Sequence, residues 1–401
     1  MDAQFNTVEI LVKTYQGLEQ ILAEELKALG GKKVEVLHRA VRCEGDKKAL
    51  YRINYEARTA LRVLVPIKTF KAKHENHFYK RVQEVNWLDY LNLKTTFAVN
   101  AVTKSKYMRH SKYLALKTKD AIVDQMRPHF NGQRPYIDTV NPDFRFNVHL
   151  SKDNVCTLSL DSSGNSLYKR GYRVASVEAP MSEVLAAGLV MLSGWTGETP
   201  FIDPMCGSGT IPIEAALIAR RIPPQWKRQR FGFQSWRDFD AKLWSEVKSE
   251  AQANIRPAPA PILGFDQDFN AFQSASKNLN SADLRDTVKV LWKKMSKIEH
   301  DFEQGTLVVN PPYNERLEET DIEDFYARMG DQFKQKFTGF DAYVISANRE
   351  AMKRIGLKAS KKHIIFNGPL ECRFQHYELY QGSRREEKDE NVKFKTDESE
   401  M

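Results

Sequence analysis

Cysteine is scarce in this sequence, and long apolar runs are missing. The four cysteines among 401 residues are far apart and form no CxxC pair, which argues against a disulfide framework or a zinc site. No stretch approaches the roughly 18 consecutive apolar residues of a membrane span, and the N-terminus lacks the basic and apolar regions of a signal peptide. We therefore expect a reduced, cytoplasmic protein with no metal and no membrane partner.

Acidic residues are in short supply in residues 1–173. This region carries 30 Lys and Arg against 18 Asp and Glu, a net charge of +12, whereas the rest of the chain carries −3. Concentrated positive charge attracts polyanions such as nucleic acid, although a solvated basic surface without a partner is the alternative. The apolar content of 41% is globular and sufficient for buried cores.

Alternating strand-like and helical segments predict three folded units and a tail. Residues 1–65 have a β-α-β-α order, in which we expect one strand over 34–41 and a helix over 49–63. Residues 66–160 contain a helix candidate and several strands. The alternation in 161–383 predicts a parallel, doubly wound α/β sheet. Residues 384–401 are rich in charge and poor in apolar side chains, so we expect them to be disordered.

A glycine-containing loop follows an apolar strand that ends in an acid. The segment runs Phe201-Ile202-Asp203-Pro204-Met205-Cys206-Gly207-Ser208-Gly209-Thr210, and a helix is predicted from Thr210. Two glycines let a ligand approach the backbone, and a helix N-terminus presents free N–H groups. The next strand ends at Asp266, where a carboxylate can accept hydrogen bonds from ribose hydroxyls. Each signal alone is weak, because plain turns and surface acids give the same pattern.

A third strand runs into Asn310-Pro311-Pro312-Tyr313. An exocyclic amine on a base is a poor nucleophile because its lone pair is delocalised into the ring. The Asn310 side-chain oxygen and the Pro311 carbonyl can accept its two N–H bonds, while the prolines stiffen the loop. Tyr313 can stack on a flipped base. A proline turn that caps a strand is the alternative, but the glycine loop on an earlier strand makes coincidence a poor explanation.

These motifs together resemble class I S-adenosylmethionine-dependent amino methyltransferases, and most closely the bacterial 23S rRNA guanine-N2 methyltransferases with a THUMP domain. Further similar stretches begin at Tyr113, Asp161, Leu167 and Asn367. The resemblance implies a ferredoxin-like segment (1–65), an α+β THUMP RNA-binding domain (66–160) and a Rossmann-like methyltransferase domain (161–383). It implies S-adenosylmethionine as cofactor, 23S rRNA as partner and no obligate protein partner.

The resemblance also assigns roles to residues. The cofactor would be held by the glycine loop and the next strand end, through Asp203, Pro204, Cys206, Gly207, Gly209, Thr210 and Asp266. The amine and base would be held by Asn310, Pro311, Pro312 and Tyr313. We interpret Cys206 as a small packing residue, because amine methylation needs no thiolate. The predicted reaction is direct methyl transfer to the exocyclic N2 of a guanine.

A basic stretch with interleaved aromatic residues lies in residues 101–119, which contain no acid. Cations neutralise phosphates and aromatic rings stack on unpaired bases, although a solvated helix face gives the same pattern. With the regional charge and the THUMP resemblance, we expect RNA contacts from Lys104, Lys106, Arg109, Lys112 and Lys117, and a continuation of the same track at Lys169 and Arg170.

Two positions depart from the family pattern. Asn314 stands where a glycine is usual, and Lys294 stands where an acid usually contacts the adenine amine. These departures leave open a non-catalytic RNA-binding assembly factor. Adenine-N6 methylation of DNA or RNA is the other alternative, since that class shares Asn-Pro-Pro-Tyr. The aromatic segment around 225–233 can either line the base pocket or pack onto the fold.

Overall fold

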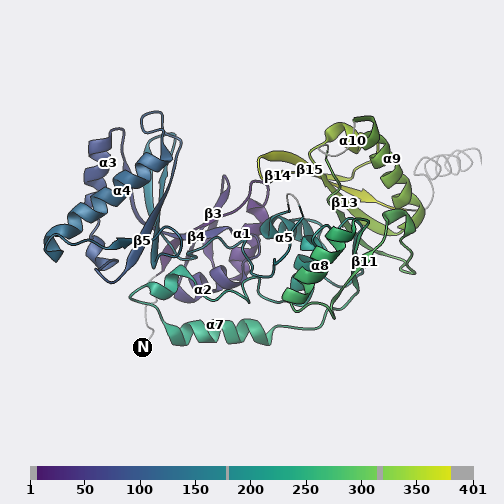
Figure 1. Cartoon of the computed structure of the whole chain (residues 1–401), viewed down its shortest axis with the longest axis horizontal. Helices are drawn as coiled ribbons and strands as arrows, with labels where there is room; N and C mark the ends of the chain where they lie inside the picture. Colours follow the sequence, from purple (N-terminus) through teal and green to yellow (C-terminus); the bar gives the residue numbers. More distant parts are fainter. Residues whose placement is uncertain (1–6, 178–179, 314–318, 381–401) are drawn as a thin grey trace, which may run out of the picture. The chain divides into compact units, whose positions relative to one another are not determined.

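The computed structural model describes residues 7–177, 180–313 and 319–380, and the chain divides into two compact units (Figure 1). The first unit comprises 1–173, 182–188 and 220–256. The second comprises 174–181, 189–219 and 257–401. The helix α5 (Glu183–Leu192) spans a boundary between them. The charged tail and Asn314 lie outside the described residues.

Among the described residues, the first unit forms one eight-stranded sheet in the order β2-β3-β1-β4-β8-β7-β5-β6. The strands are β1 (Val8–Lys13), β2 (Lys32–Leu37), β3 (Ala40–Gly45), β4 (Arg62–Lys71), β5 (Thr96–Thr103), β6 (Tyr136–Ile137), β7 (Phe144–Leu150) and β8 (Val155–Asp161). The helices are α1 (Glu19–Ala28), α2 (Lys47–Glu56), α3 (Glu75–Gln83), α4 (Ser111–Met126) and α7 (Ala241–Ala253), with short 3-10 turns at η1 (Trp87–Asp89), η2 (Arg127–Phe130) and η3 (Gly232–Ser235). Figure 1 shows α3 and α4 side by side against the strands around β5.

The long strand β4 belongs to two domains at once. Its first residues pair with β1, with Leu11 opposite Leu64, and its remainder pairs with β8 from Leu64 to Lys71. Separate apolar cores lie on the two halves, one with Leu22 and Ile53 and the other with Phe97 and Phe146. The boundary expected between residues 65 and 66 therefore falls inside a continuous strand.

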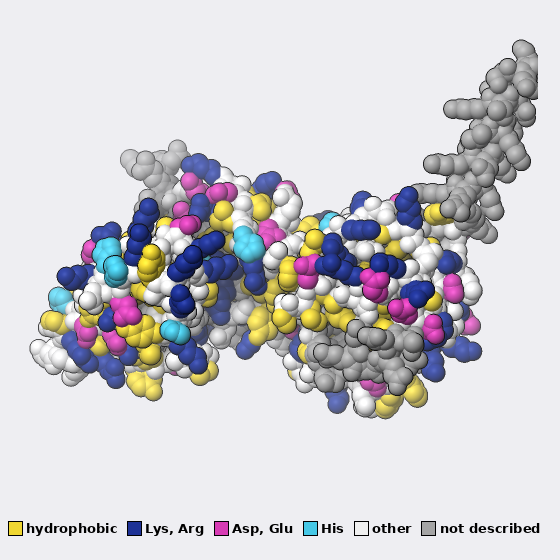
Figure 2. Space-filling model, turned by 90° about the horizontal axis from the view of Figure 1, so that it is seen from above, with side chains coloured by type: hydrophobic (Ala, Val, Ile, Leu, Met, Phe, Trp, Pro, Cys, Tyr) yellow, Lys and Arg dark blue, Asp and Glu magenta, His cyan; other side chains and the backbone are white. Residues whose placement is uncertain are grey.

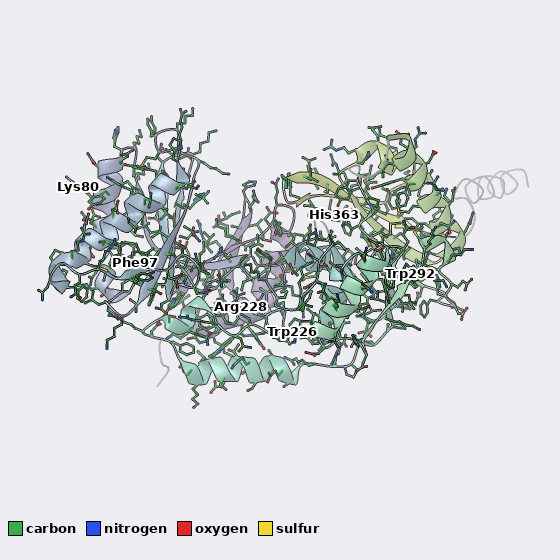
Figure 3. All side chains as sticks on the ribbon, viewed as in Figure 1. Lys80, Phe97, Trp226, Arg228, Trp292 and His363 are labelled. Atoms are coloured by element: carbon green, nitrogen blue, oxygen red, sulfur yellow. The ribbon has the colours of Figure 1, made fainter. Side chains whose placement is uncertain are left out.

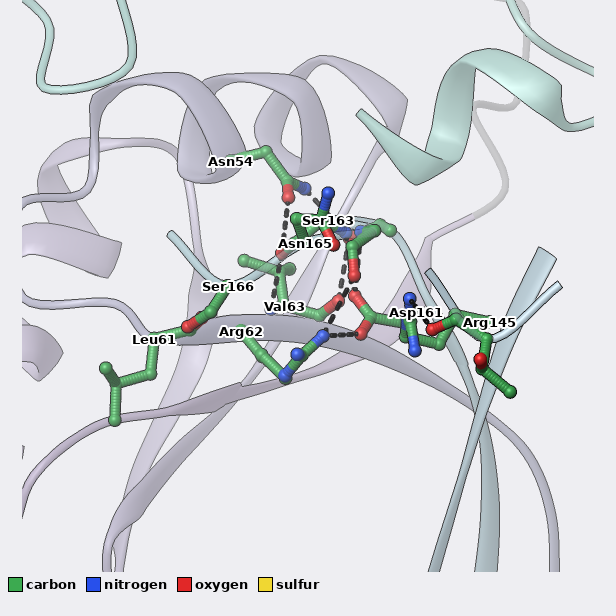
Figure 4. Close-up of polar contacts among 12 residues, drawn as sticks. Asn54, Leu61, Arg62, Val63, Arg145, Asp161, Ser163, Asn165 and Ser166 are labelled. Carbon is green, nitrogen blue, oxygen red and sulfur yellow. Dashed lines mark hydrogen bonds and ion pairs between the residues drawn. The ribbon is translucent and has the colours of Figure 1, made fainter. Parts of the chain in front are cut away.

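A buried polar network joins the start of β4 to the end of β8 (Figure 4). The Asp161 carboxylate pairs with Arg62 and accepts hydrogen bonds from the backbone N–H of Ser163 (2.9 Å) and Gly164 (3.1 Å). Asn54 of α2 donates to the Ser162 hydroxyl at 2.8 Å and accepts from the Ser163 hydroxyl at 2.9 Å. Buried polar groups are costly unless they are paired, so this segment fixes the strand ends to α2.

The segment 220–256 packs with the first unit, although chain order places it in the methyltransferase region. Tyr51 of α2 stacks on Phe233 with ring centroids 4.4 Å apart, and Tyr55 meets Trp244 of α7 at 5.4 Å. Phe231 and Phe233 are almost fully buried. Trp226 and Arg228 lie on the same segment in Figure 3. Of the two interpretations of its aromatic residues, the structure supports packing onto the fold.

Two local expectations for residues 34–63 are wrong. The predicted single strand over 34–41 is a hairpin of β2 and β3, whose turn places Arg39 at φ 57°. No glycine marks this turn, because Arg39 itself takes the left-handed conformation. The predicted helix over 49–63 ends at Glu56, and Asp46 caps its start by accepting from the Ala49 N–H at 2.8 Å.

Among its described residues, the second unit forms a seven-stranded sheet in the order β11-β10-β9-β12-β13-β15-β14. The strands are β9 (Phe201–Asp203), β10 (Ile262–Asp266), β11 (Val288–Trp292), β12 (Gly305–Val309), β13 (Phe340–Ser346), β14 (Lys361–Asn367) and β15 (Leu370–Glu378). The helices are α6 (Thr210–Ala219), α8 (Phe269–Ser281), α9 (Glu319–Lys336) and α10 (Arg349–Lys353), with a 3-10 turn at η4 (Met295–Lys297). Strands β9 to β13 are parallel, as predicted, whereas β14 and β15 are an antiparallel addition.

Candidate active site

Three predicted site segments meet at one edge of the second sheet. Strand β9 lies between β10 and β12, with Gly264 opposite Asp203 and Leu307 opposite Ile202. All three strands run parallel, so Asp203, Asp266 and Asn310 follow their carboxyl ends. The chain order reverses between β9 and β12, and such a switch point is where open α/β sheets bind ligands.

The glycine loop is held in a single conformation by hydrogen bonds from the backbone. The N–H of Gly207 donates to Asp266 Oδ2 at 2.8 Å, and that of Gly209 donates to the Cys206 carbonyl at 2.8 Å. Gly209 has a φ of +81°, and a Cβ there would lie 3.1 Å from Ala275 on α8. The loop therefore needs glycine for both its backbone angle and its approach to α8. The helix α6 begins at Thr210, as predicted.

The carboxyl group of Asp203 is buried and has room for a hydrogen bond from a cationic ligand. It is only 1% exposed, and burial, aided by the nearby Asp266 charge, raises the pKa of its carboxyl well above the usual range. Its Oδ1 accepts from the Met205 N–H at 3.1 Å, while its Oδ2 is buried with no hydrogen-bond partner in the described structure. An unpaired buried oxygen is costly, and an ammonium group would satisfy it.

Asp266 is half-buried, and burial also raises the pKa of its carboxyl. Its two oxygens accept from the N–H groups of Gly207 and Asp268 at 2.8 and 2.9 Å. Each carboxylate oxygen can accept further bonds, so capacity remains for ribose hydroxyls. The residues present thus fit S-adenosylmethionine at its ammonium and ribose ends. Lys294, at the expected adenine contact, is exposed and offers no acceptor, whereas the nearby Trp292 indole donates to the Gln267 carbonyl at 2.9 Å (Figure 3).

Cys206 contributes its backbone and its bulk rather than a reactive thiol. It is 7% exposed, and burial with the charges of Asp203 and Asp266 raises the pKa of its thiol well above the usual range. A neutral thiol is a poor nucleophile. A Cβ added at Gly264 would lie 3.2 Å from its Sγ, which shows how closely the side chain is packed.

The Asn310–Tyr313 loop is folded onto itself. The Tyr313 hydroxyl donates to Asn310 Oδ1 at 2.6 Å, so the acceptor proposed for a substrate amine is already engaged within the protein. Burial raises the pKa of the Tyr313 hydroxyl, which keeps it protonated and able to donate. Pro311 is buried and Pro312 exposed. A base that enters the site would have to displace this hydroxyl from Asn310.

Sequence inspection missed the side chains that hold these loops. The Tyr326 hydroxyl on α9 donates to the Pro312 carbonyl at 3.2 Å and contacts the Ser346 hydroxyl at 2.7 Å, and Asn348 donates to the Tyr313 carbonyl at 3.3 Å. Asn278 on α8 donates to the carbonyls of Ala175 and Ser208 at 2.8 and 2.9 Å.

The predicted RNA-contact residues lie on the first unit, in two different environments. Lys104, Lys106, Arg109, Lys112 and Lys169 are exposed, and Lys117 is half-buried with its ammonium 5.1 Å from the centre of the Tyr79 ring. Arg170 is a correction: its side chain is fully buried, and its guanidinium donates to the carbonyls of Leu167 (3.0 Å) and Arg58. It fixes the chain after β8 and is not available to RNA.

The described residues contain no group of three or more His, Cys, Asp or Glu side chains arranged to hold a metal ion. Within the same part of the chain, no helix is both long enough and apolar enough to cross a membrane.

Three family models match the chain in succession. They are an RlmL ferredoxin-like domain at residues 9–64, a THUMP domain at 72–161 and an RMKL-like methyltransferase domain at 170–376. These matches confirm the predicted fold class, with a ferredoxin-like and a THUMP domain ahead of an α/β methyltransferase domain. The match at 72–161 starts at the end of β4.

Similar curated proteins carry RNA methyltransferase names. The chain is 40% identical to slr0064 of Synechocystis sp., named as an RNA methyltransferase, over 91% of this chain and 95% of that protein. It is 37% identical to the Ribosomal RNA large subunit methyltransferase K/L of Syntrophotalea carbinolica over 91% of this chain. The match covers 52% of that enzyme, so the chain spans about half the length of the K/L proteins.

Solved structures show the same architecture. SMU.472, described as a methyltransferase and solved in complex with SAH, has a TM-score of 0.85 and 29% identity, with 94% of this chain and 99% of that chain covered. A Listeria monocytogenes protein named as an N6-adenine-specific DNA methylase has a TM-score of 0.82 and 30% identity over 93% and 97% of the two chains.

Proposed function

The chain belongs to the RMKL-like methyltransferase family, and on that basis we propose that it transfers a methyl group from S-adenosylmethionine to the exocyclic N2 of a guanine in 23S rRNA. The observation that carries the proposal is the meeting of Asp203, Asp266 and Asn310 at the carboxyl ends of three adjacent parallel strands. Such an rRNA substrate would place the protein in the bacterial cytoplasm.

The cofactor would be held by groups already described. When bound, S-adenosylmethionine supplies a methyl group on a positively charged sulfur, which an amine can displace directly without a covalent enzyme intermediate. The buried Asp203 Oδ2, which has no partner in the described structure, would accept from the ammonium of the methionine moiety, and Asp266 would accept from the ribose hydroxyls. The glycine loop would let the backbone pass close to the ligand.

The target amine would be held by the loop after β12. Asn310 Oδ1 and the Pro311 carbonyl accept its two N–H bonds and orient its lone pair toward the methyl carbon. Holding the reacting atoms about 3–3.5 Å apart supplies most of the rate. Once the base displaces the Tyr313 hydroxyl from Asn310, the ring of Tyr313 is free to stack on that base.

Two other functions are each favoured by one observation. The Listeria protein's name favours an adenine-N6 methylase, whereas the exposed Lys294 is compatible with an RNA-binding assembly factor that no longer holds the cofactor. The THUMP domain and the basic first unit favour structured RNA over duplex DNA.

The experiment that tests the proposal is nucleoside mass spectrometry of rRNA from cells with and without the gene. Loss of one N2-methylguanosine from 23S rRNA is expected. Loss of an N6-methyladenosine instead would assign the adenine-specific reaction. Unchanged rRNA nucleosides, together with no S-adenosylmethionine binding by calorimetry, would replace the enzyme by the assembly factor.

A further inference from the structure

Three loops meet at one end of the eight-stranded sheet. They are residues 72–76 after β4, 104–110 after β5 and 151–154 between β7 and β8. Asn154 joins all three, because its carbonyl accepts from the Ala72 N–H at 2.9 Å and its side-chain oxygen from the Ser105 hydroxyl at 2.6 Å. The N–H of Lys104 donates to the Leu150 carbonyl at 2.9 Å. We call this the loop end of the sheet.

The loop 104–110 is ordered by its own hydroxyl groups. The buried Ser105 hydroxyl accepts from the N–H groups of Tyr107 (3.1 Å) and Met108 (3.4 Å), and the Thr103 hydroxyl donates to the Met108 carbonyl at 2.7 Å. Met108 is buried, whereas the Tyr107 ring is 60% exposed. The Tyr107 ring therefore faces solvent from a loop whose backbone is already ordered. A ligand that binds the ring then causes little further loss of conformational entropy in this loop.

A hollow of about 350 Å³ lies beside this ring. It is lined by Lys73, His74, Glu75, Asn76, Tyr107 and Met108. Its volume falls at the lower end of the roughly 300–1,000 Å³ typical of small-ligand pockets. The side chains around it offer two flat rings, those of Tyr107 and His74, together with hydrogen-bond donors and acceptors, which is the combination that binds unpaired bases.

Positive charge predominates around the hollow, although Glu75 and Asp153 lie on the same loops. Seven exposed cations lie at the last residue of β4, on the loop end or in the first turn of α4, and none forms an ion pair with a described residue: Lys71, Lys73, Lys104, Lys106, Arg109, Lys112 and Lys152. Besides burial, the charge of Lys104 lowers the pKa values of Lys13 and His149, which shows that like charges are close together here. Lys and Arg side chains gather over this unit, at the left of Figure 2.

We infer that the loop end binds an unpaired nucleotide of the RNA substrate, with the base in the hollow against Tyr107 and the flanking phosphates on Lys73, Lys104 and Lys106. The inference rests on the proposed function and adds a second RNA contact, outside the methyl-transfer site. A duplex cannot use the hollow because its bases are stacked and paired. Preference for unpaired over duplex RNA is thus the property that this site confers.

The test compares Tyr107 with an equally exposed tyrosine of the same sheet. Tyr136, on β6, is 73% exposed and pairs with the first residue of β5, at the opposite end from the loop. Full-length Tyr107→Ala, Tyr107→Phe and Tyr136→Ala are titrated with a fluorescent single-stranded RNA oligonucleotide and with a blunt RNA duplex. Tyr107→Ala should weaken single-strand binding roughly 5- to 150-fold, the range of one base stack. Tyr107→Phe and Tyr136→Ala should bind as the wild type does.

Three results would overturn the inference. Tyr107→Ala and Tyr136→Ala could bind the single strand with equal affinity, or Tyr107→Ala could lose as much affinity for the duplex as for the single strand. Polyglutamate, a polyanion without bases, could also displace the single strand equally well from every variant. A His74→Ala variant, which changes another wall of the hollow, should also weaken single-strand binding selectively. Methylation of 23S rRNA by the wild type is assayed in parallel. A Tyr107-dependent preference without methylation would retain the nucleotide site and reject the proposed reaction, whereas the converse would reject the site alone.

Discussion

Lys104 and Lys106 of the first unit project into water, whereas Asp203 of the second unit is 1% exposed and has an oxygen with no partner in the described structure. Exposed cations gain little from any one contact and act together on a polyanion in a salt-dependent way. A buried carboxylate is strongly selective for the one ligand that satisfies it. Under the proposed function, the exposed cations would capture the large RNA substrate, and the buried carboxylate would position the small cofactor.

The largest effect on turnover is expected at Asn310, in the second unit. Asn310→Ala should lower kcat by about 10²-fold or more, because its oxygen matters mainly in the transition state. S-adenosylmethionine affinity should stay near that of the wild type. A tritium-transfer assay measures the first quantity and calorimetry the second. Wild-type turnover in this variant would remove the loop after β12 from the mechanism.

The next effect is on cofactor affinity. Asp266→Ala should weaken S-adenosylmethionine binding by about 1.5–3 kcal/mol, the scale of a hydrogen bond to a charged group. Asp268→Ala is the matched control, because this exposed carboxylate caps α8 by accepting from the Asn270 N–H at 2.9 Å. Equal calorimetric affinities for the two variants would reject the ribose assignment.

The dependence of cofactor affinity on pH tests the buried carboxylate. Burial raises the pKa of Asp203, so its proton returns at a higher pH than for an ordinary Asp of about 3.9. Since the ammonium needs the ionised form, affinity should fall as the pH is lowered toward the raised pKa of Asp203. Asp203→Asn should bind weakly and show a flatter profile over the same calorimetric series, and parallel profiles would contradict the assignment.

The exposed cations should each contribute a small part of the RNA affinity and of its dependence on salt. Changing Lys104, Lys106, Arg109 and Lys112 together to Ala should reduce the slope of log affinity against log salt by about 3, given roughly 0.7–0.9 for each phosphate contact. Cofactor binding should not change. Filter binding on a 23S rRNA fragment measures the slope, and a wild-type slope with wild-type affinity would mean that this face is only solvated.

The smallest effect is expected for Tyr313→Phe. The variant keeps the stacking ring but removes the hydroxyl that donates to Asn310. Turnover should stay within about threefold of the wild type and KM for RNA should fall, because the amine no longer competes with that hydroxyl. Tyr313→Ala should impair both parameters. A large loss of kcat in Tyr313→Phe would show that the hydroxyl acts in the reaction itself.

The sequence was sufficient for features encoded within a few consecutive residues. The sequence predicted the acid at the end of β9, the glycines after it and the start of α6 at Thr210. It also predicted that strands β9 to β13 are parallel. Arg170 was misjudged because its burial depends on Arg58 and Leu167, and the carbonyls that bind it become neighbours only after folding. The hollow beside Tyr107 could not be foreseen, because its lining comes from two loops that are distant in sequence, 73–76 and 107–108.

For the same reason, the sequence alone could not decide between the two interpretations of the aromatic insert between α6 and β10. Its aromatic residues pack against Tyr51 and Tyr55, more than one domain away along the chain. A truncation near Leu160, which the domain order suggests, would remove α2 and leave Phe231 and Phe233 exposed. Point variants in the full chain are consequently the better test of the two units.

The sharing of β4 has a mechanical consequence. This strand pairs first with β1 and then with β8, with one irregularity in register between Pro66 and Lys68, so the ferredoxin-like and THUMP domains share a strand and no separate linker joins them. A pull by RNA on the loop end would be transmitted through the strand to the β1 side rather than absorbed by a linker. The amide hydrogens of residues 63–65 should accordingly exchange with solvent as slowly as those of either core, and both domains should unfold in one cooperative step.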